Sequence, residues 1–239
     1  MPFKLLVFIL LIASVSFAQP ASQDTAFVAS AKQNTKNLYN QFITSQSQLY
    51  RGSDYHKYVP TEDEHPYFMT DDWKEGTIAY DGENYENVPL LYDMFKDKVI
   101  IENYGSNNEM ILVDEKIEQF TIEKHVFVHL LKNKSTYIKE GYYDLLYNGK
   151  LKFYVKREKS LQKKIRTGQI YNYFVTVDNY YILKNGMYFN VKTKKSVLDL
   201  LNEREQDLKQ FLSKNKIHFN TDREHAIRLM VEFFDTTKN

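Results

Sequence analysis

Between residues 76 and 193, apolar and polar residues alternate with a period of two, as in strands that bury one face. Short apolar runs of this kind lie at residues 88–92, 99–102 and 110–113. A longer run at residues 120–131 predicts a strand whose buried face is formed by Phe120, Ile122, Val126, Val128 and Leu130. The opposite, exposed face of that strand would carry His125 and His129. The pattern therefore predicts a β-rich region over residues 76–193.

Two Asn-Gly pairs in this region predict tight hairpin turns. Asn148-Gly149 and Asn185-Gly186 each separate two short apolar runs. Such a pair supplies the positive φ angles that a two-residue turn requires. Because a hairpin joins antiparallel strands, we expect a mainly antiparallel sheet and not a parallel nucleotide-binding sheet.

Apolar residues recur at helical spacing on both sides of the strand region. Asp24 is placed to cap a helix over residues 24–50, and a polar loop is expected over residues 52–75. Capping-box patterns that begin at Ser196 and Thr221 predict helices within residues 196–234. The predicted fold class is α+β, mainly antiparallel β. It consists of an N-terminal helix, a curved sheet or partial barrel of hairpins, and a C-terminal helical pair.

Residues 1–18 have the three parts of a secretory signal peptide. They are a positive charge at Lys4, an apolar run over residues 5–15, and small residues at Ser16 and Ala18 before a predicted cleavage site. The run is shorter than the roughly 20 residues needed to span a bilayer. We therefore expect export to the periplasm or the extracellular space, and a single globular domain over residues 19–239 with no transmembrane segment.

The composition is sufficient for an apolar core, and charge is distributed unevenly along the chain. The chain is 43% hydrophobic and 15% aromatic and has no cysteine, which excludes thiol catalysis and iron–sulfur clusters. Between Asp54 and Glu115 there are 16 acids and four bases, whereas residues 116–200 hold 17 bases and seven acids. This asymmetry marks either an interaction surface or two segments that neutralise each other within one domain, and the second interpretation is the simpler.

Linear signatures of catalysis are absent from the sequence, which contains no Gly-x-Ser-x-Gly, phosphate-binding loop or His-Glu-x-x-His motif. His125 and His129 lie four residues apart on a predicted strand, about 13 Å, which is too far for one metal ion. The acidic run before His65 lacks the pattern of a calcium loop. We therefore predict no metal site and no cofactor, we name no catalytic residue, and we favour a protein that is not an enzyme.

Tyrosine provides the candidate binding residues, since ten of the 19 tyrosines lie between residues 137 and 188. Rings with a polar tip are suited to a ligand-facing platform. The candidate residues are Trp73, Tyr142, Tyr143, Tyr147 and Tyr154. The alternatives are that the tyrosines are half-exposed strand residues and that Trp73 fills the core.

A basic segment is the second candidate surface. Residues 150–166 contain eight basic side chains and a single acid, Glu158. In an exported protein, anionic polysaccharide or lipid head groups are more available partners than nucleic acid, which we do not expect as a partner. The alternative is a solvated basic strand and loop.

Three stretches resemble a group of uncharacterised exported bacterial proteins. They are residues 49–93 (LYRGSDYHKYVPTEDEHPYFMTDDWKEGTIAYDGENYENVPLLYD), 141–161 (GYYDLLYNGKLKFYVKREKSL) and 180–201 (YYILKNGMYFNVKTKKSVLDLL). The resemblance implies export and a bacterial envelope setting. It implies no activity, cofactor or catalytic residue, because none is assigned to that group.

Three functions are compatible with these patterns. The first is a non-catalytic envelope protein that binds a partner protein or a glycan, and the aromatic hairpins and segregated charge favour it. The second is a hydrolase acting on an envelope or environmental polymer, which would need two close carboxylates in a cleft. The third is an accessory subunit whose C-terminal helices dock on a membrane complex. The sequence leaves the oligomeric state open.

Overall fold

The computed structural model describes residues 27–35, 48–58, 64–102, 108–132 and 138–237. The chain divides into two compact units, residues 1–42 and residues 43–239. The described part of the first unit is a helix over residues 27–35, which falls inside the predicted helix over residues 24–50. The predicted signal peptide lies outside the described residues.

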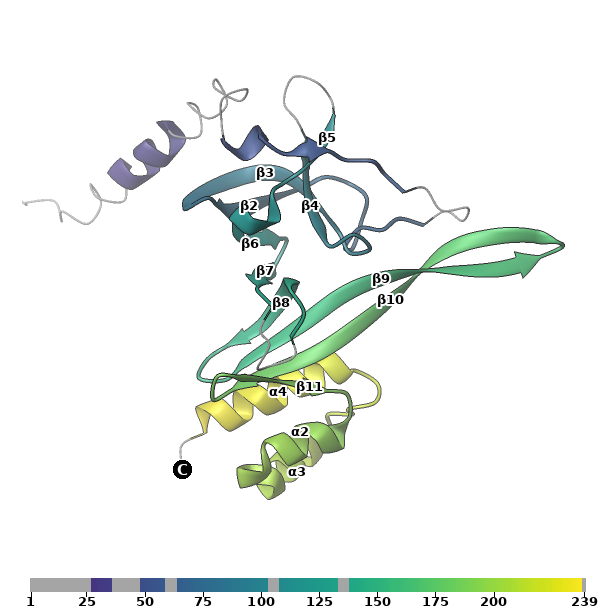
Figure 1. Cartoon of the computed structure of the whole chain (residues 1–239). Helices are drawn as coiled ribbons and strands as arrows, with labels where there is room; N and C mark the ends of the chain where they lie inside the picture. Colours follow the sequence, from purple (N-terminus) through teal and green to yellow (C-terminus); the bar gives the residue numbers. More distant parts are fainter. Residues whose placement is uncertain (1–26, 36–47, 59–63, 103–107, 133–137, 238–239) are drawn as a thin grey trace, which may run out of the picture. The chain divides into compact units, whose positions relative to one another are not determined.

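The second unit is built on one open, antiparallel sheet of 11 strands in the order β1-β5-β4-β3-β2-β6-β7-β8-β9-β10-β11 (Figure 1). This confirms the prediction of a mainly antiparallel β protein with flanking helices, whereas curvature into a partial barrel remains a prediction. The strands are β1 (Ser53–Asp54), β2 (Lys74–Tyr80), β3 (Glu83–Asp93), β4 (Lys98–Glu102), β5 (Glu109–Ile111), β6 (Ile117–Ile122), β7 (His125–Leu130), β8 (Gly141–Asn148), β9 (Lys152–Arg166), β10 (Gln169–Lys184) and β11 (Met187–Val191).

Two large apolar cores lie along this sheet. The first is formed by side chains from β2 to β8, including Phe120 and Phe127, whose rings stack 4.9 Å apart. The second joins β8 to β11 with the C-terminal helices and includes Val197, Leu208 and Ile227. The described chain also contains the short 3-10 helices η1 (Gln48–Tyr50), η2 (Asp114–Lys116) and η3 (Asn202–Arg204).

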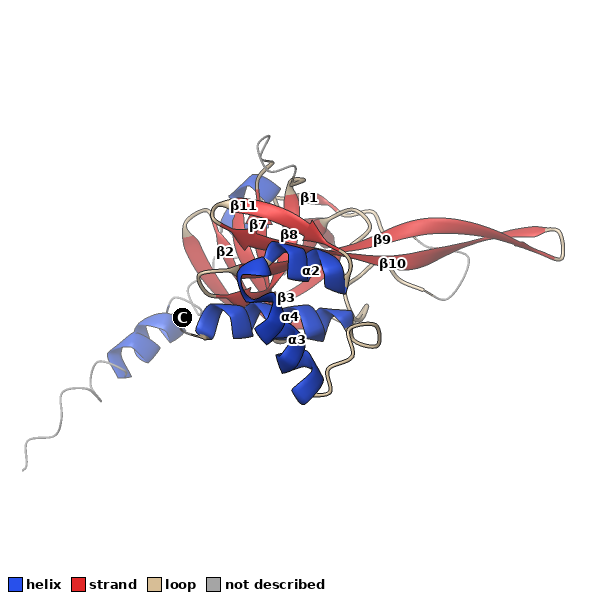
Figure 2. Ribbon diagram, turned by 90° about the horizontal axis from the view of Figure 1, so that it is seen from below, coloured by secondary structure: helices blue, strands red, loops and turns tan. Residues whose placement is uncertain are grey.

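Three α-helices, and not the predicted pair, cover the last strands (Figure 2). They are α2 (Lys194–Leu200), α3 (Glu205–Lys214) and α4 (Arg223–Thr236). The cap of α2 is Thr193, whose side chain accepts from the backbone N–H of Ser196, so the predicted cap was three residues late. The side chain of Asp222 caps α4 by accepting from the backbone N–H of His225. Within the described residues, none of the helices is long and apolar enough to cross a bilayer.

The two predicted Asn-Gly turns have different outcomes. Asn185 and Gly186 have φ angles of 52° and 77° and join β10 to β11, which confirms that turn. Asn148 instead pairs with Lys152, so the loop between β8 and β9 spans residues 149–151. The carboxylate of Asp235 on α4 accepts from the Lys150 backbone N–H at 2.8 Å. This tertiary contact holds the wider loop in place of a tight turn.

The predicted strand over residues 120–131 is wrong, because the structure folds this run into the hairpin of β6 and β7. Glu123 takes a left-handed φ of 54° at the turn, although neither glycine nor asparagine marks it. The turn pairs Phe120 with Phe127 and Ile122 with His125. The buried face of β7 therefore carries Phe127 together with His125 and His129. Both histidines are largely buried, although they were predicted on the exposed face.

Several ion pairs connect the acidic and basic segments within the second unit. Lys156 lies 2.5 Å from Asp97, Lys116 lies 2.8 Å from Asp81, and Lys74 lies 3.7 Å from Glu123. The segments thus neutralise each other in part, as the simpler interpretation of the charge distribution predicted.

Candidate functional site

The longest feature of the sheet is the ribbon formed by β9 and β10, which projects beyond its neighbouring strands (Figures 1 and 2). The pairing of β9 with β8 ends at Val155, and the pairing of β10 with β11 begins at Tyr180. Between these points β9 and β10 pair only with each other, out to Arg166 and Gln169. We call residues 162–173 the distal arm.

The end of the distal arm is apolar on one face. The register places Ile165 directly opposite Ile170, so that both side chains lie on the same face, next to the turn at Thr167-Gly168. Ile165 is 75% exposed and Ile170 is 60% exposed. More than half of each side chain lies in water, so the pair gains little from burial and is a candidate contact surface for a partner.

Cations surround this apolar pair. Lys163 lies on the isoleucine face, two cross-strand pairs away. Lys164 lies on the opposite face, where its Nζ is 4.6 Å from the ring centre of Tyr173. Arg166 flanks the turn. No aspartate or glutamate occurs between residues 159 and 177. The arm therefore presents apolar surface and positive charge together.

Aromatic contacts fix the base of the arm on the sheet. Phe174 is buried, with its ring centre 5.9 Å from that of Tyr58 and 5.4 Å from that of Phe95. Lys159 donates from Nζ to the carbonyl oxygens of His65 and Tyr67, at 2.6 and 3.0 Å. Burial lowers the pKa of Lys159. These contacts anchor the base of the ribbon on the sheet.

A buried ion cluster lies deeper in the ribbon, around Arg157. Its guanidinium donates to Asp144 on β8 from Nε at 2.9 Å and from Nη2 at 2.6 Å. It also donates to both carboxylate oxygens of Glu224 on α4, at 2.8 and 3.1 Å, and to Asp178 at 3.2 Å. His125 Nδ1 lies 2.7 Å from the same Asp144 oxygen. Arg157 thus joins two strands to α4.

Three carboxylates share this single guanidinium, and the cluster is incompletely satisfied. The Oδ1 atoms of Asp144 and Asp178 are buried and have no hydrogen-bond partner among the described residues. Burial raises the pKa of Asp178, against the opposing effect of Arg157. The pKa of Arg157 is raised by its carboxylate partners, although burial opposes the shift. The cluster is therefore sensitive to the loss of any member.

A cavity of about 410 Å³ opens beside this cluster, at the N-terminus of α4. It is lined by Lys124, His125, Leu146, Asp222, Glu224, His225 and Arg228. Both acids in its wall already have structural partners: Glu224 binds Arg157, and Asp222 caps α4. The cavity consequently lacks the pair of uncommitted carboxylates that acid–base hydrolysis requires.

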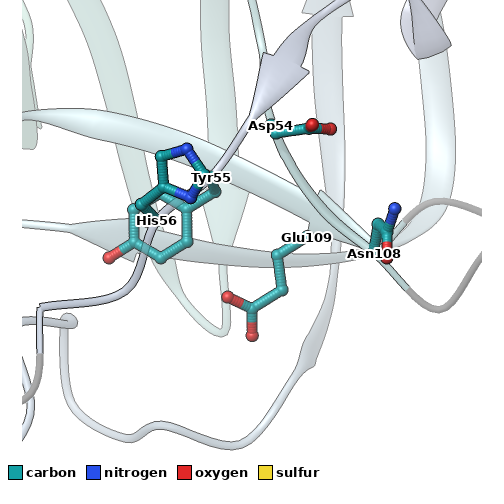
Figure 3. A pocket seen from close by; sticks show the side chains of 5 residues that line it. All are labelled: Asp54, Tyr55, His56, Asn108 and Glu109. Atoms are coloured by element: carbon teal, nitrogen blue, oxygen red, sulfur yellow. The ribbon is translucent and has the colours of Figure 1, made fainter.

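A second, shallower pocket of about 270 Å³ lies at the β1–β5 edge, lined by Asp54, Tyr55, His56, Asn108 and Glu109 (Figure 3). The Tyr55 hydroxyl points away to the buried carboxylate of Asp93, to which it donates at 2.7 Å. Burial and this bond raise the pKa of Tyr55. Tyr55 is thus a structural residue of the pocket and not a reactive one.

The five candidate binding residues lie mainly in the core and not on a common surface. Tyr142, Tyr143 and Tyr154 are buried, and burial raises the pKa of each hydroxyl. Trp73 packs partly buried beside Tyr55 and Tyr67, in line with the alternative that it fills the core. Tyr147 donates to Asp235 at 2.9 Å, and its pKa is raised to about 12, chiefly by burial. Three of the five candidate rings are therefore buried, and a binding role for the five residues stays a prediction.

The sequence identified residues 150–166 as a basic segment, but it did not predict that β9 and β10 project beyond the sheet. The signal for the arm is Thr167-Gly168, which lies midway between two alternating runs and adopts φ angles of 48° and 80°. Both strands are much longer than the usual five or six residues, so their ends cannot all be covered by the sheet.

Comparisons with protein families, curated proteins and solved structures found no match to this chain. Within the described residues, no group of three histidine, aspartate or glutamate side chains is arranged to hold a metal ion.

Proposed function

We propose that this chain is a non-catalytic, exported bacterial envelope protein that binds its partner, a protein or a glycan, through the distal arm. The observation that carries the proposal is the exposed Ile165–Ile170 pair at the end of a ribbon that extends past its neighbouring strands. Export through the predicted signal peptide and a periplasmic or extracellular location belong to the same proposal, as does membership of the group of exported proteins that the sequence resembles.

Most of the polar side chains discussed above already form structural contacts, which supports binding over catalysis. The Tyr142 hydroxyl and the carboxylates of Asp144, Glu224 and Asp93 each have partners that hold strands and helices together. The distal arm, by contrast, has an apolar pair whose exposure has no structural role. An exposed apolar surface lowers the solubility of the folded chain, so its presence favours a binding function.

The test compares two hairpin tips of the same chain. Ile165→Thr with Ile170→Thr keeps the β-branched shape and removes the apolar surface, while Met187→Thr changes a 51% exposed residue beside the Asn185-Gly186 turn. Both proteins and the native chain are presented to immobilised envelope proteins and to a glycan array. Loss of binding by the arm variant alone supports the proposal. Equal binding by all three proteins contradicts it.

A polymer hydrolase remains the second proposal, because the cavity beside α4 contains His125 and His225, although both acids in its wall have structural partners. The purified chain is incubated with envelope polysaccharides, and released reducing ends are measured. His225→Ala, which changes an exposed residue, should abolish the release if the cavity is catalytic. No release above that of the variant would eliminate this function.

A further inference from the structure

We propose that the outer edge of β9, residues 161–165, binds an extended, acidic segment of a partner protein, which adds to the sheet as one more strand. This inference rests on the proposed function, because it names the kind of partner that the arm binds and the way in which the partner is held.

The backbone of the outer edge presents unused hydrogen-bonding groups. In an antiparallel pair, the N–H and C=O groups of successive residues point alternately to the two sides of the strand. Lys159 directs its N–H away from β10, because it donates to the carbonyl oxygen of Met94 at 3.1 Å. The backbone groups of Leu161, Lys163 and Ile165 therefore point the same way, and they have no hydrogen-bond partner within the part of the chain that the structure describes. An added strand would pair with these groups.

The opposite edge of the ribbon, on β10, is already engaged in part. Phe174 donates its backbone N–H to the carboxylate of Glu64, and Asn172 has a partner as well. The run of unpaired alternate residues is therefore longer on β9, which makes β9 the edge that an added strand would use.

The side chains of the outer edge indicate the sequence of the partner. Leu161, Lys163 and Ile165 lie on one face of the ribbon, because alternate residues of a strand share a face. Ile165 is exposed, and Leu161 is half-buried. Lys163 is exposed and has no ion pair or hydrogen bond from its side chain to any described residue. A partner strand with a carboxylate opposite Lys163, and with apolar residues two positions before and after it, complements all three.

A second copy of the arm is a poorer occupant of this edge. If two outer edges paired about Lys163, the two ammonium groups would face each other, which is unfavourable. The sequence contains no aspartate or glutamate between residues 159 and 177 that could compensate them in a shifted register. Lysine on an edge strand thus disfavours self-association and favours an acidic segment of another protein.

The probe is a fluorescent, capped heptapeptide, Thr-Val-Thr-Glu-Thr-Val-Thr, whose valines and glutamate share one face when it is extended. Its binding to the full chain is measured by fluorescence anisotropy. Lys163→Pro and Lys163→Gln form a matched pair, because both remove the charge and only proline removes the outward N–H. Proline is tolerated on an edge strand whose N–H faces solvent, and thermal unfolding checks that each variant is folded. Thr176→Pro is the control on β10, because its N–H points outward like that of Phe174, two residues earlier.

The native chain and Thr176→Pro should bind the peptide equally well. Lys163→Gln should weaken binding by about threefold, as expected for an exposed ion pair. Lys163→Pro should weaken it by roughly tenfold more, because a backbone hydrogen bond is lost and the proline ring obstructs the added strand. The same peptide with lysine in place of glutamate should bind the native chain more weakly than the original peptide.

Four results would overturn the inference. They are no binding of the peptide to the native chain, equal losses in Lys163→Pro and Lys163→Gln, a loss in Thr176→Pro as large as in Lys163→Pro, and a dimer of the native chain that Lys163→Pro dissociates. If the peptide is not bound but the isoleucine variant loses a protein or glycan, the inference fails and the proposed function stands. If the isoleucine variant also binds proteins and glycans like the native chain, both fail.

Discussion

Replacement of Arg157 by methionine tests whether the buried cluster holds α4 on the sheet. Methionine keeps most of the apolar stem and removes five hydrogen bonds to Asp144, Asp178 and Glu224. Asp144 is fully buried, so after the substitution its carboxylate keeps only His125 as a partner within the described residues.

The expected loss in the free energy of unfolding is about 3–5 kcal/mol, because removal of one partner leaves buried charge without compensation. The carboxylates of Asp178 and Glu224 are partly exposed, and water compensates them in part, so the loss is expected from Asp144 mainly. Native domains are stable by about 5–15 kcal/mol, so this loss is a large fraction of the total. For a unit of this size it corresponds to a fall in Tm of roughly 10 °C.

The assay is urea unfolding followed by circular dichroism, with Arg228→Met as the matched control. Arg228 forms an exposed pair with Glu232 at 3.3 Å on α4, and its loss should change stability by less than about 1 kcal/mol. The double variant Arg157→Met with Asp144→Asn should recover part of the loss, because the buried charge is then gone. A loss in Arg157→Met no larger than in the control would refute the assignment of Arg157 as the link between the sheet and α4.

Three further substitutions test other parts of the fold. Gly141→Ala should lower the free energy of unfolding in urea by about 1–3 kcal/mol. Gly141 has a φ of 140°, and an added Cβ would lie 2.0 Å from the Asp97 carboxylate. An unchanged unfolding midpoint would contradict this prediction. Tyr142→Phe should lower the free energy of unfolding by about 1–2 kcal/mol through loss of the 2.9 Å bond to Asp114, and a neutral result would show that this bond is dispensable. The pKa of Asp178 is raised by burial, so its ionisation destabilises the fold as pH rises through that pKa. Asp178→Asn should therefore gain stability relative to the native chain from about pH 4 to pH 7, and a constant difference would contradict the raised pKa.

The period-two pattern predicted the strand-rich region well, because burial on one face of a sheet is recorded directly in alternating residues. It failed where the chain turns without a glycine or asparagine, as at Glu123, and the faces of β7 were exchanged as a result. It failed again in the loop after Asn148, where Asp235 accepts from the backbone N–H of Lys150, 85 residues away in sequence. Such long-range contacts leave no local signal.

The candidate site was harder to predict than the fold. Tyrosine clustering suggested a platform, but a tyrosine can bury its ring when its hydroxyl finds a partner, as Tyr142 does at Asp114. The basic segment was recognised, and the alternation around Ile165 and Ile170 was present in the sequence. What composition could not show is that the strands carrying these residues extend past all neighbours. That property depends on the lengths of β8 and β11.

The most direct test of the binding role of the arm uses the absence of cysteine from the chain. Single cysteines at Gln169 in the arm and at Lys124 in the cavity wall are labelled with an environment-sensitive fluorophore and titrated with each envelope protein or glycan that the native chain binds. We predict a blue shift of the emission from residue 169 and no shift from residue 124. A shift at residue 124 with none at residue 169 would contradict the assignment of the arm as the binding element.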